Sequence, residues 1–212
     1  MTDWKTLHPA TTWAEWGRVF TDVDVWAPAV REICRRAGLP AGTIEAGYPG
    51  SNAVFVVDRR FVVKIYAPLC PEDYALECAL YPLLSRHPDL LTPQLVAHGV
   101  LEAATTWPYV VMTFLPGEPI REARPEMSQE DRIAIARDLG WRIRILHDIP
   151  IEEQAVLDTS REGWNAYVQR ALSHTLEELS RSGTLAPELI DAMPSFVHEV
   201  LTRQGQPKLV LV

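Results

Sequence analysis

Lys64 is the residue of this chain whose position most needs a chemical explanation. It lies within an apolar run, Phe61–Tyr66, whose β-branched and aromatic residues predict a β-strand. Side chains alternate between the two faces of a strand, so Lys64 shares its face with Val62 and Tyr66. A cation there is either an edge-strand lysine that hinders aggregation or a point charge directed at an anionic ligand. The strand alone favours the edge-strand interpretation, whereas the residues around it in the sequence favour the ligand.

Glu77 is the candidate partner of Lys64. The sequence predicts a helix over about 72–86. On this helix Glu77 lies at the centre of the apolar face, between Leu80 and Tyr81. A carboxylate on a packing face is costly unless a cation meets it, so we expect an ion pair with Lys64. The alternative is a glutamate at the rim of a helix whose faces are misassigned.

A turn of small residues precedes the Lys64 strand. Gly50, Ser51 and Asn52 lie between two predicted strands, 43–46 and 53–57. Small residues there allow backbone N–H groups and the Ser51 hydroxyl to approach phosphate oxygens. The spacing differs from the known glycine-rich phosphate loops. Taken alone, this turn is better explained as an ordinary hairpin.

A second pair of predicted strands, 95–101 and 108–113, runs into a stiff connector over 115–119 with two prolines around a glycine. The backbone groups of such a connector can hydrogen-bond to a flat adenine base, with Met112 packing near the ring. The alternative is a core strand followed by a linker.

Long helices are predicted beyond the connector. Ser128 opens one with a capping-box pattern, and it runs to about His147. Another spans 161–181, and Pro187 and Pro194 are each typical of the first turn of a shorter helix. The strands thus precede the connector and the helices follow it, which suggests two lobes.

The order of these elements is more specific than any one of them. It resembles the protein-kinase-like fold and, more closely, the aminoglycoside phosphotransferase family. The segments that carry the resemblance are Gly50–Phe55, Val62–Tyr66, Val111–Pro119 and Ile145–His147. The resemblance covers most of residues 43–212.

The resemblance implies an α+β, two-lobed kinase-like fold. Its N-lobe is expected to be an antiparallel sheet of about five strands with one packed helix, followed by a mostly helical and incomplete C-lobe. The expected domains are an N-terminal helical extension, a nucleotide-binding N-lobe, a hinge and a partial C-lobe. These span 1–40, 41–112, 113–117 and 118–212.

The resemblance also implies roles for single residues. Lys64, held by Glu77, would contact the phosphates of ATP or GTP, as would the turn Gly50–Asn52. The Thr113 carbonyl and the Leu115 amide would hydrogen-bond adenine, and Met112 would close the back of the pocket. His147 occupies a position typical of the family and is expected to be structural there.

The family's catalytic residues have no counterpart in this sequence. A His-x-Asp loop with a following Asn and a second Asp would orient the attacking hydroxyl and hold Mg²⁺. The His-x-Asp in this sequence, His87-Pro88-Asp89, lies before the predicted hinge and not after the long helices, where the family has its loop, and the chain ends at a predicted buried strand, Leu209–Val212. We therefore expect no catalytic residue and no metal site within the 212 residues. We expect Mg²⁺ to bind only when the missing catalytic half is present. The chain alone is expected to have no phosphotransferase activity.

The leading hypothesis is an ATP-dependent phosphotransferase that transfers the γ-phosphate to a small-molecule hydroxyl. The alternatives are a non-catalytic nucleotide-binding or interaction module, and another kinase-like branch of choline, homoserine or fructosamine kinase type. Glu118 and Glu122 could meet a cationic substrate, although a solvated surface is the favoured explanation for them. The identity of the substrate stays open.

Composition limits the class of protein. The chain is 47% hydrophobic and carries a net charge of −8, which argues against a general binder of nucleic acids or anionic membranes. Its three cysteines have no paired or metal-like spacing, and its N-terminus lacks the apolar stretch of a signal peptide. We expect a cytoplasmic protein of undetermined oligomeric state.

Overall fold

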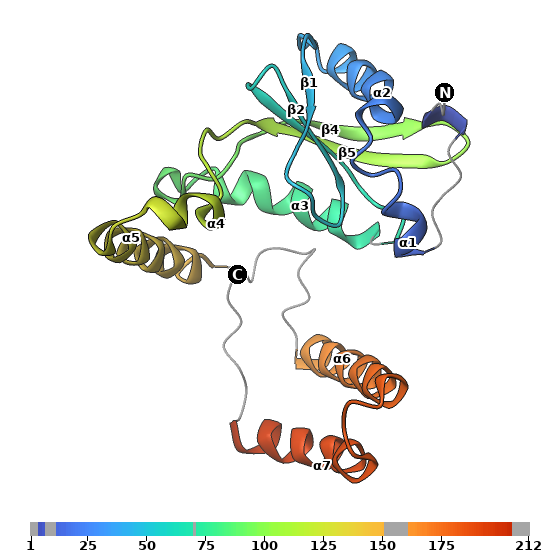
Figure 1. Ribbon diagram of the computed structural model, residues 1–212, viewed down its shortest axis with the longest axis vertical. Coiled ribbons are helices and arrows are strands. Elements are labelled where there is room, and N and C mark those ends of the chain that lie inside the picture. The colour runs from blue at the N-terminus through green and yellow to red at the C-terminus, as the bar shows by residue number, and fades with distance from the viewer. Residues whose placement is uncertain (1–3, 7–11, 70, 151–160, 205–212) are drawn as a thin grey trace. The chain divides into compact units, whose positions relative to one another are not determined.

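The computed structural model describes residues 4–6, 12–69, 71–150 and 161–204. The chain divides into two compact units, Met1–Arg142 and Ile143–Val212. The first contains a five-stranded sheet with its helices and the second is helical, so the mixed α+β prediction is confirmed (Figure 1). The predicted hinge at 113–117 stays a prediction about where the lobes meet.

The sheet is antiparallel, with its strands in the order β1-β2-β3-β5-β4. The strands are β1 Ile44–Ala46, β2 Ala53–Val57, β3 Phe61–Ile65, β4 Leu95–Glu102 and β5 Thr106–Thr113. All five are predicted by the sequence, and no predicted end differs from the observed one by more than two residues.

β3 lies at the centre of this sheet. Lys64 pairs with Val54 on β2 and with Val110 on β5. An edge strand is paired on one side only, so the edge-strand interpretation of Lys64 is wrong. The charge stands in the middle of a sheet and has to be explained by what it faces.

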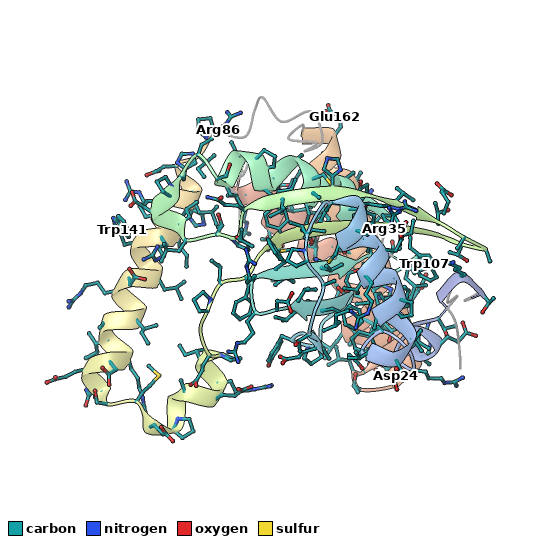
Figure 2. The ribbon with its side chains drawn as sticks, turned by 90° about the horizontal axis from the view of Figure 1, so that it is seen from above. Asp24, Arg35, Arg86, Trp107, Trp141 and Glu162 are labelled. Carbon is teal, nitrogen blue, oxygen red and sulfur yellow. The ribbon has the colours of Figure 1, made fainter. Side chains whose placement is uncertain are left out.

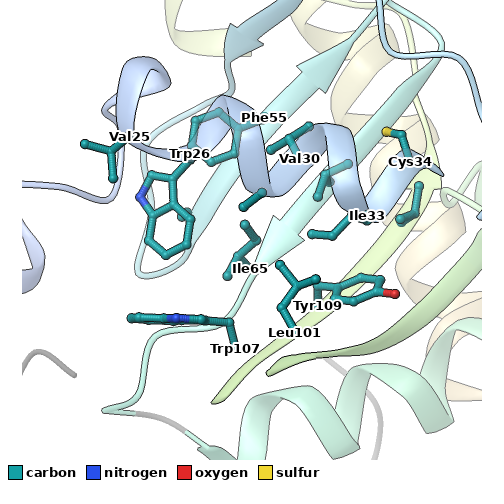
Figure 3. Close-up of a cluster of buried hydrophobic side chains, with 14 of the residues drawn as sticks. Val25, Trp26, Val30, Ile33, Cys34, Phe55, Ile65, Leu101, Trp107 and Tyr109 are labelled. Carbon is teal, nitrogen blue, oxygen red and sulfur yellow. The ribbon is translucent and has the colours of Figure 1, made fainter. Parts of the chain in front are cut away.

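One face of the sheet is largely apolar and is covered by α2, Val23–Arg36. Val63 and Ile65 of β3 point to this face and pack in one cluster with Trp26 and Ile33 of the helix, all four fully buried (Figure 3). The predicted lobe has a single packed helix. The structure adds α2, which comes from the segment whose role the sequence leaves unassigned.

The other face is covered by α3, Pro71–Leu84. Here Tyr66 and Met112 form a smaller buried cluster, against which Tyr74 and Tyr81 of the helix pack. The predicted alternation along β3 is therefore confirmed. Figure 1 shows the sheet between α2 and α3.

Local sequence explains where α2 begins and ends. The Asp22 side chain accepts hydrogen bonds from the N–H groups of Asp24 and Val25, which caps the first turn. The helix stops before Gly38, whose φ of +68° is a left-handed conformation that glycine adopts freely. Figure 2 labels Asp24 near its start and Arg35 near its end. Two short helices precede it, η1 Trp4–Thr6 and α1 Trp13–Trp16.

The helices after β5 follow the predicted order. They are α4 Ile120–Ala123, η3 Arg124–Glu126, α5 Gln129–His147, α6 Arg161–Ser182 and α7 Pro187–Gln204. A further short helix, η2 Pro88–Leu90, lies between α3 and β4. The capping box at Ser128 is confirmed, because its hydroxyl accepts from the Asp131 N–H at 3.1 Å.

Pro194 corrects one prediction. It lies inside the single helix α7 and does not begin a second one. An interior proline lacks one N–H and crowds the preceding turn, but here the helix continues through it. The predicted strand Leu209–Val212 lies outside the described residues. None of the helices in the described part of the chain is long and apolar enough to cross a membrane.

Asp58 ties the β2–β3 hairpin to the residues before β1 and yields a test of the fold. Its carboxylate accepts from the N–H groups of Gly42 at 3.1 Å and Thr43 at 2.7 Å, and these bonds hold the pKa of Asp58 below its usual value. A lowered folded pKa stabilises the protein above the unfolded value of about 3.9, and this contribution is lost as the pH falls.

Asp58→Asn keeps one acceptor and tolerates the left-handed φ of 51° at this position, but it cannot titrate. We expect the urea midpoint of the variant to fall less than that of the wild type between about pH 6 and pH 3. The exposed Asp191→Asn is the control. Parallel pH dependences of wild type and Asp58→Asn would contradict the assignment.

Candidate functional site

The centre of the candidate site is an ion pair between Lys64 on β3 and Glu77 on α3. The Lys64 Nζ contacts Glu77 Oε1, as the helix wheel predicts. The two side chains are 19% and 22% exposed, so both are largely withdrawn from water while one side stays accessible. The predicted ion pair is confirmed.

Two tyrosines complete the surroundings of the Glu77 carboxylate. The Tyr66 hydroxyl donates to Oε2 at 2.8 Å and the Tyr81 hydroxyl donates to the same oxygen at 3.2 Å. Lys64 also lies over the Tyr66 ring, with Nζ 5.0 Å from its centroid. With three donors on one carboxylate, Glu77 stays in place and fixes the ammonium group.

These tyrosines are held neutral. Burial raises the pKa of the Tyr66 hydroxyl far above its usual value, and the negative charge of Glu77 raises it further. The same two causes raise the pKa of Tyr81, and burial raises that of Tyr74 to about 12. Tyr66 and Tyr81 therefore remain hydrogen-bond donors to Glu77 over the whole physiological range.

The β1–β2 loop, defined here as residues 47–52, is fixed at both ends. At its start the Gly47 N–H donates to the Val54 carbonyl at 2.7 Å, and a Cβ on Gly47 would stand 2.6 Å from the Val54 Cγ1. Only glycine fits there. A Cβ on Gly50 would meet nothing within 4 Å, so space does not require glycine at that position.

Asn52 at the end of the loop is buried, 3% exposed. Its Oδ1 accepts from the Ala67 N–H at 2.8 Å and so joins the start of β2 to the residues after β3. The side chain is thus used within the fold, and the prediction that Asn52 faces phosphate applies to its backbone alone. Gly50 and Ser51 are exposed.

The connector after β5 starts from a well-fixed strand end. Thr113 exchanges two hydrogen bonds with Gln94, through its N–H and its hydroxyl, and the Phe114 N–H donates to the Arg60 carbonyl. Met112 is 6% exposed, and its sulfur accepts from the Tyr81 hydroxyl at 3.4 Å. Within the described residues the N–H of Leu115, which is exposed, has no hydrogen-bond partner.

The register of the sheet places the three parts of the site along β3. Ala53, next to the loop, pairs with Ile65, and Thr113, next to the connector, pairs with Phe61. Lys64 lies between them, three strand residues or roughly 10 Å from Phe61. The loop, the cation and the connector therefore follow one another along a single strand.

Some contributors to the site escape sequence reasoning. Tyr66 and Tyr81 are recognisable as neighbours of Lys64 and Glu77, but the sequence does not show that both hydroxyls bind one carboxylate oxygen. The hydrogen bond from Trp16 to the loop joins residues 35 positions apart and has no sequence signal. Among the described residues, no three His, Cys, Asp or Glu side chains gather as a metal site would require.

A family model matches most of the chain. The model for the phosphotransferase enzyme family, APH, matches residues 44–212. The chain belongs to this family. The match begins at the first residue of β1, so α1 and α2 of this phosphotransferase-family chain lie outside it.

Solved structures have the same fold. The GDP and kanamycin complex of APH(2")-IIia aligns with a TM-score of 0.61 at 17% identity, covering 80% of this chain and 57% of that chain. The streptomycin–ATP complex of APH(2")-IIa aligns with a TM-score of 0.55 at 17% identity, covering 81% of this chain and 57% of that chain. The ADP-bound aminoglycoside phosphotransferase APH(2'')-Ib aligns with a TM-score of 0.54 at 17% identity, covering 83% of this chain and 58% of that chain. The predicted kinase-like fold is confirmed, and this phosphotransferase-family chain spans 57–58% of the length of these three proteins.

A double-mutant cycle tests the ion pair. Lys64→Met leaves Glu77 without its cation, and Glu77→Gln leaves Lys64 without its anion while keeping an acceptor for the tyrosines. Each single change is expected to lower the free energy of unfolding by about 1–3 kcal/mol, less than for a fully buried pair. The double variant should regain about 1–2 kcal/mol relative to additivity in urea denaturation.

The exposed pair Arg203–Glu199 is the matched control, because its charges are well solvated. The cycle Arg203→Met with Glu199→Gln should show little coupling. Additive losses at Lys64 and Glu77 would mean that the two charges do not depend on each other.

The raised pKa of Tyr66 predicts a specific alkaline destabilisation. Above about pH 10 the unfolded chain releases the tyrosine proton while the folded chain keeps it, so stability falls as the pH rises. Tyr66→Phe cannot titrate and should lose stability less steeply, by up to about 1.4 kcal/mol per pH unit. The measurement is urea unfolding between about pH 9 and pH 11, with the exposed Tyr48→Phe as control. Equal slopes for wild type and Tyr66→Phe would refute the assignment.

Proposed function

We propose that this chain holds the nucleotide of an ATP- or GTP-dependent phosphotransferase that transfers the γ-phosphate to a hydroxyl group of a small molecule. The observation that carries the proposal is the ion pair between Lys64 of the central strand and Glu77 of α3. A partly accessible ammonium group, fixed by a carboxylate with three donors, is suited to bind phosphate oxygens without reorganising.

Each part of the site has a role in this proposal. Lys64 binds the phosphates, and the β1–β2 loop covers them with backbone N–H groups and the Ser51 hydroxyl. The Thr113 carbonyl and the Leu115 N–H bind the adenine edge, and Met112 closes the site behind the base. Neighbours of the same fold, solved with ATP, ADP or GDP, support a nucleotide as the ligand.

The acceptor is proposed as a small molecule with a hydroxyl group. Related structures contain streptomycin or kanamycin, which are small polyhydroxylated molecules. A cationic acceptor suits the net charge of −8 and the exposed Glu118 and Glu122, which follow the predicted hinge. The described residues hold and orient a nucleotide and supply no metal site of their own, so no step through Mg²⁺ is assigned to them.

Nucleotide titration of Lys64→Ala tests the proposal. A charge-assisted contact to phosphate contributes about 1.5–3 kcal/mol, so the dissociation constant for ATP should rise by roughly tenfold to a hundredfold. Isothermal titration calorimetry with ATP and with GTP gives both the affinity and the base preference. Arg86→Ala is the control, since it removes one exposed positive charge at the end of α3 and should leave affinity unchanged.

A folded Lys64→Ala protein that binds ATP as tightly as the wild type would remove the basis of the proposal. Wild-type protein that binds neither nucleotide would favour the non-catalytic interaction module. Thermal unfolding of each variant checks that a loss of affinity is not a loss of fold.

A further inference from the structure

The β1–β2 loop is held by a residue outside the family match. Trp16, the last residue of α1, donates its indole N–H to the Ser51 carbonyl at 2.8 Å. Trp16 is 2% exposed, so the donor side of this bond is shielded from water, while Ser51 itself is exposed. Residues 35 positions apart are thereby joined at the point where the loop would meet phosphates.

The donor is itself rigidly placed. The Trp16 ring stacks on Trp107 of β5 at 6.0 Å and meets the edge of Trp26 of α2 at the same distance. Trp26 in turn packs edge-on against Trp107 at 5.0 Å, and its own indole N–H donates to the Val19 carbonyl at 2.9 Å. Figure 3 shows Trp26 above Trp107 in this cluster. Three buried indoles that fix one another leave Trp16 little freedom to move.

The short helix α1 fixes the backbone position of Trp16, its last residue. Thr12 caps it, accepting from the Glu15 N–H at 3.2 Å, while the Glu15 carboxylate accepts from the Thr12 N–H at 3.3 Å. The next turn continues from the helix, because the Val19 N–H donates to the Trp16 carbonyl at 3.0 Å. The backbone around Trp16 is therefore fixed on both sides.

The loop has two further anchors, the Gly47 N–H on Val54 and the Asn52 side chain on Ala67. They leave Tyr48, Pro49 and Gly50 exposed, with Ser51 between this exposed part and the buried Asn52. The Ser51 carbonyl is thus the last fixed point before the part of the loop that is free to meet a ligand.

We propose that Trp16 is a positioning residue of the nucleotide site, which presets the β1–β2 loop for a nucleoside triphosphate through the Ser51 carbonyl. The inference rests on the proposed function for its ligand. It makes the N-terminal segment a working part of the site, because loop order established before binding does not have to be established at binding.

The chain offers matched tryptophan controls. Trp16→Phe keeps an aromatic ring in the cluster and removes the N–H that holds the loop. Trp26→Phe removes a buried indole N–H whose partner is Val19, away from the loop. Trp107→Phe removes a buried N–H that has no partner among the described residues. All three lose similar packing, and only the first loses the bond to Ser51.

Two measurements on each purified protein test whether Trp16 positions the loop. Both are made well below the unfolding temperature of that protein. Hydrogen–deuterium exchange without nucleotide reports the order of the loop amides, and calorimetric titration reports the affinity for ATP. Trp16→Phe should raise exchange over 47–52 and weaken ATP binding by roughly tenfold each, as expected for one lost hydrogen bond. Trp26→Phe and Trp107→Phe keep an aromatic ring beside Trp16 and leave its hydrogen bond to Ser51 in place, so each should change both quantities by less than about threefold.

The outcomes separate this inference from the proposed function. Loop exchange in Trp16→Phe no faster than in the two controls overturns the inference, and so does unchanged ATP affinity in a loosened loop. A wild-type protein that binds no ATP overturns the proposed function instead, and the exchange result then still decides whether Trp16 holds the loop.

Discussion

The structure depends on one electrostatic constraint: a lysine on the central strand of a sheet that is covered on both faces. A cation withdrawn from water needs a partner, and Glu77 supplies it. That requirement fixes which turn of α3 lies over Lys64. The hydroxyls of Tyr66 and Tyr81 then satisfy the remaining oxygen of Glu77, so the pair is supported by groups from both the strand and the helix.

The two faces of the sheet consequently do different work. The α2 face is packed with apolar residues, among them the fully buried Phe55, Val63 and Ile65, and it supplies rigidity. The α3 face buries polar groups among the apolar ones and keeps Lys64 and Glu77 partly accessible. The charged pair on the α3 face is tolerated because the apolar packing on the α2 face stabilises the sheet.

The sequence predicts those parts of this arrangement that follow from the alternation of side chains along a strand or their spacing along a helix. Strand composition and helix spacing are enough to place Lys64 and Glu77 on facing surfaces. They are not enough to exclude an edge strand, since strand order depends on which distant segments pair. The burial of Asn52 and the insertion of Pro194 within α7 also escape, because each depends on contacts outside the local pattern. Local pattern thus identifies the charged pair, and tertiary contacts determine how it is held.

In the role proposed for Trp16, the N-terminal segment acts on the site through the loop, without touching the ligand. A flexible loop that closes on phosphates loses conformational freedom at about 1–2 kcal/mol per backbone residue fixed. In this chain Gly47, Ser51 and Asn52 are already fixed, so only the exposed residues between them remain to be ordered. Pro49 among these has a restricted φ, which lowers the remaining cost further. In the proposed role, affinity gained in this way comes from the bond between Trp16 and Ser51, although the indole need not contact the nucleotide.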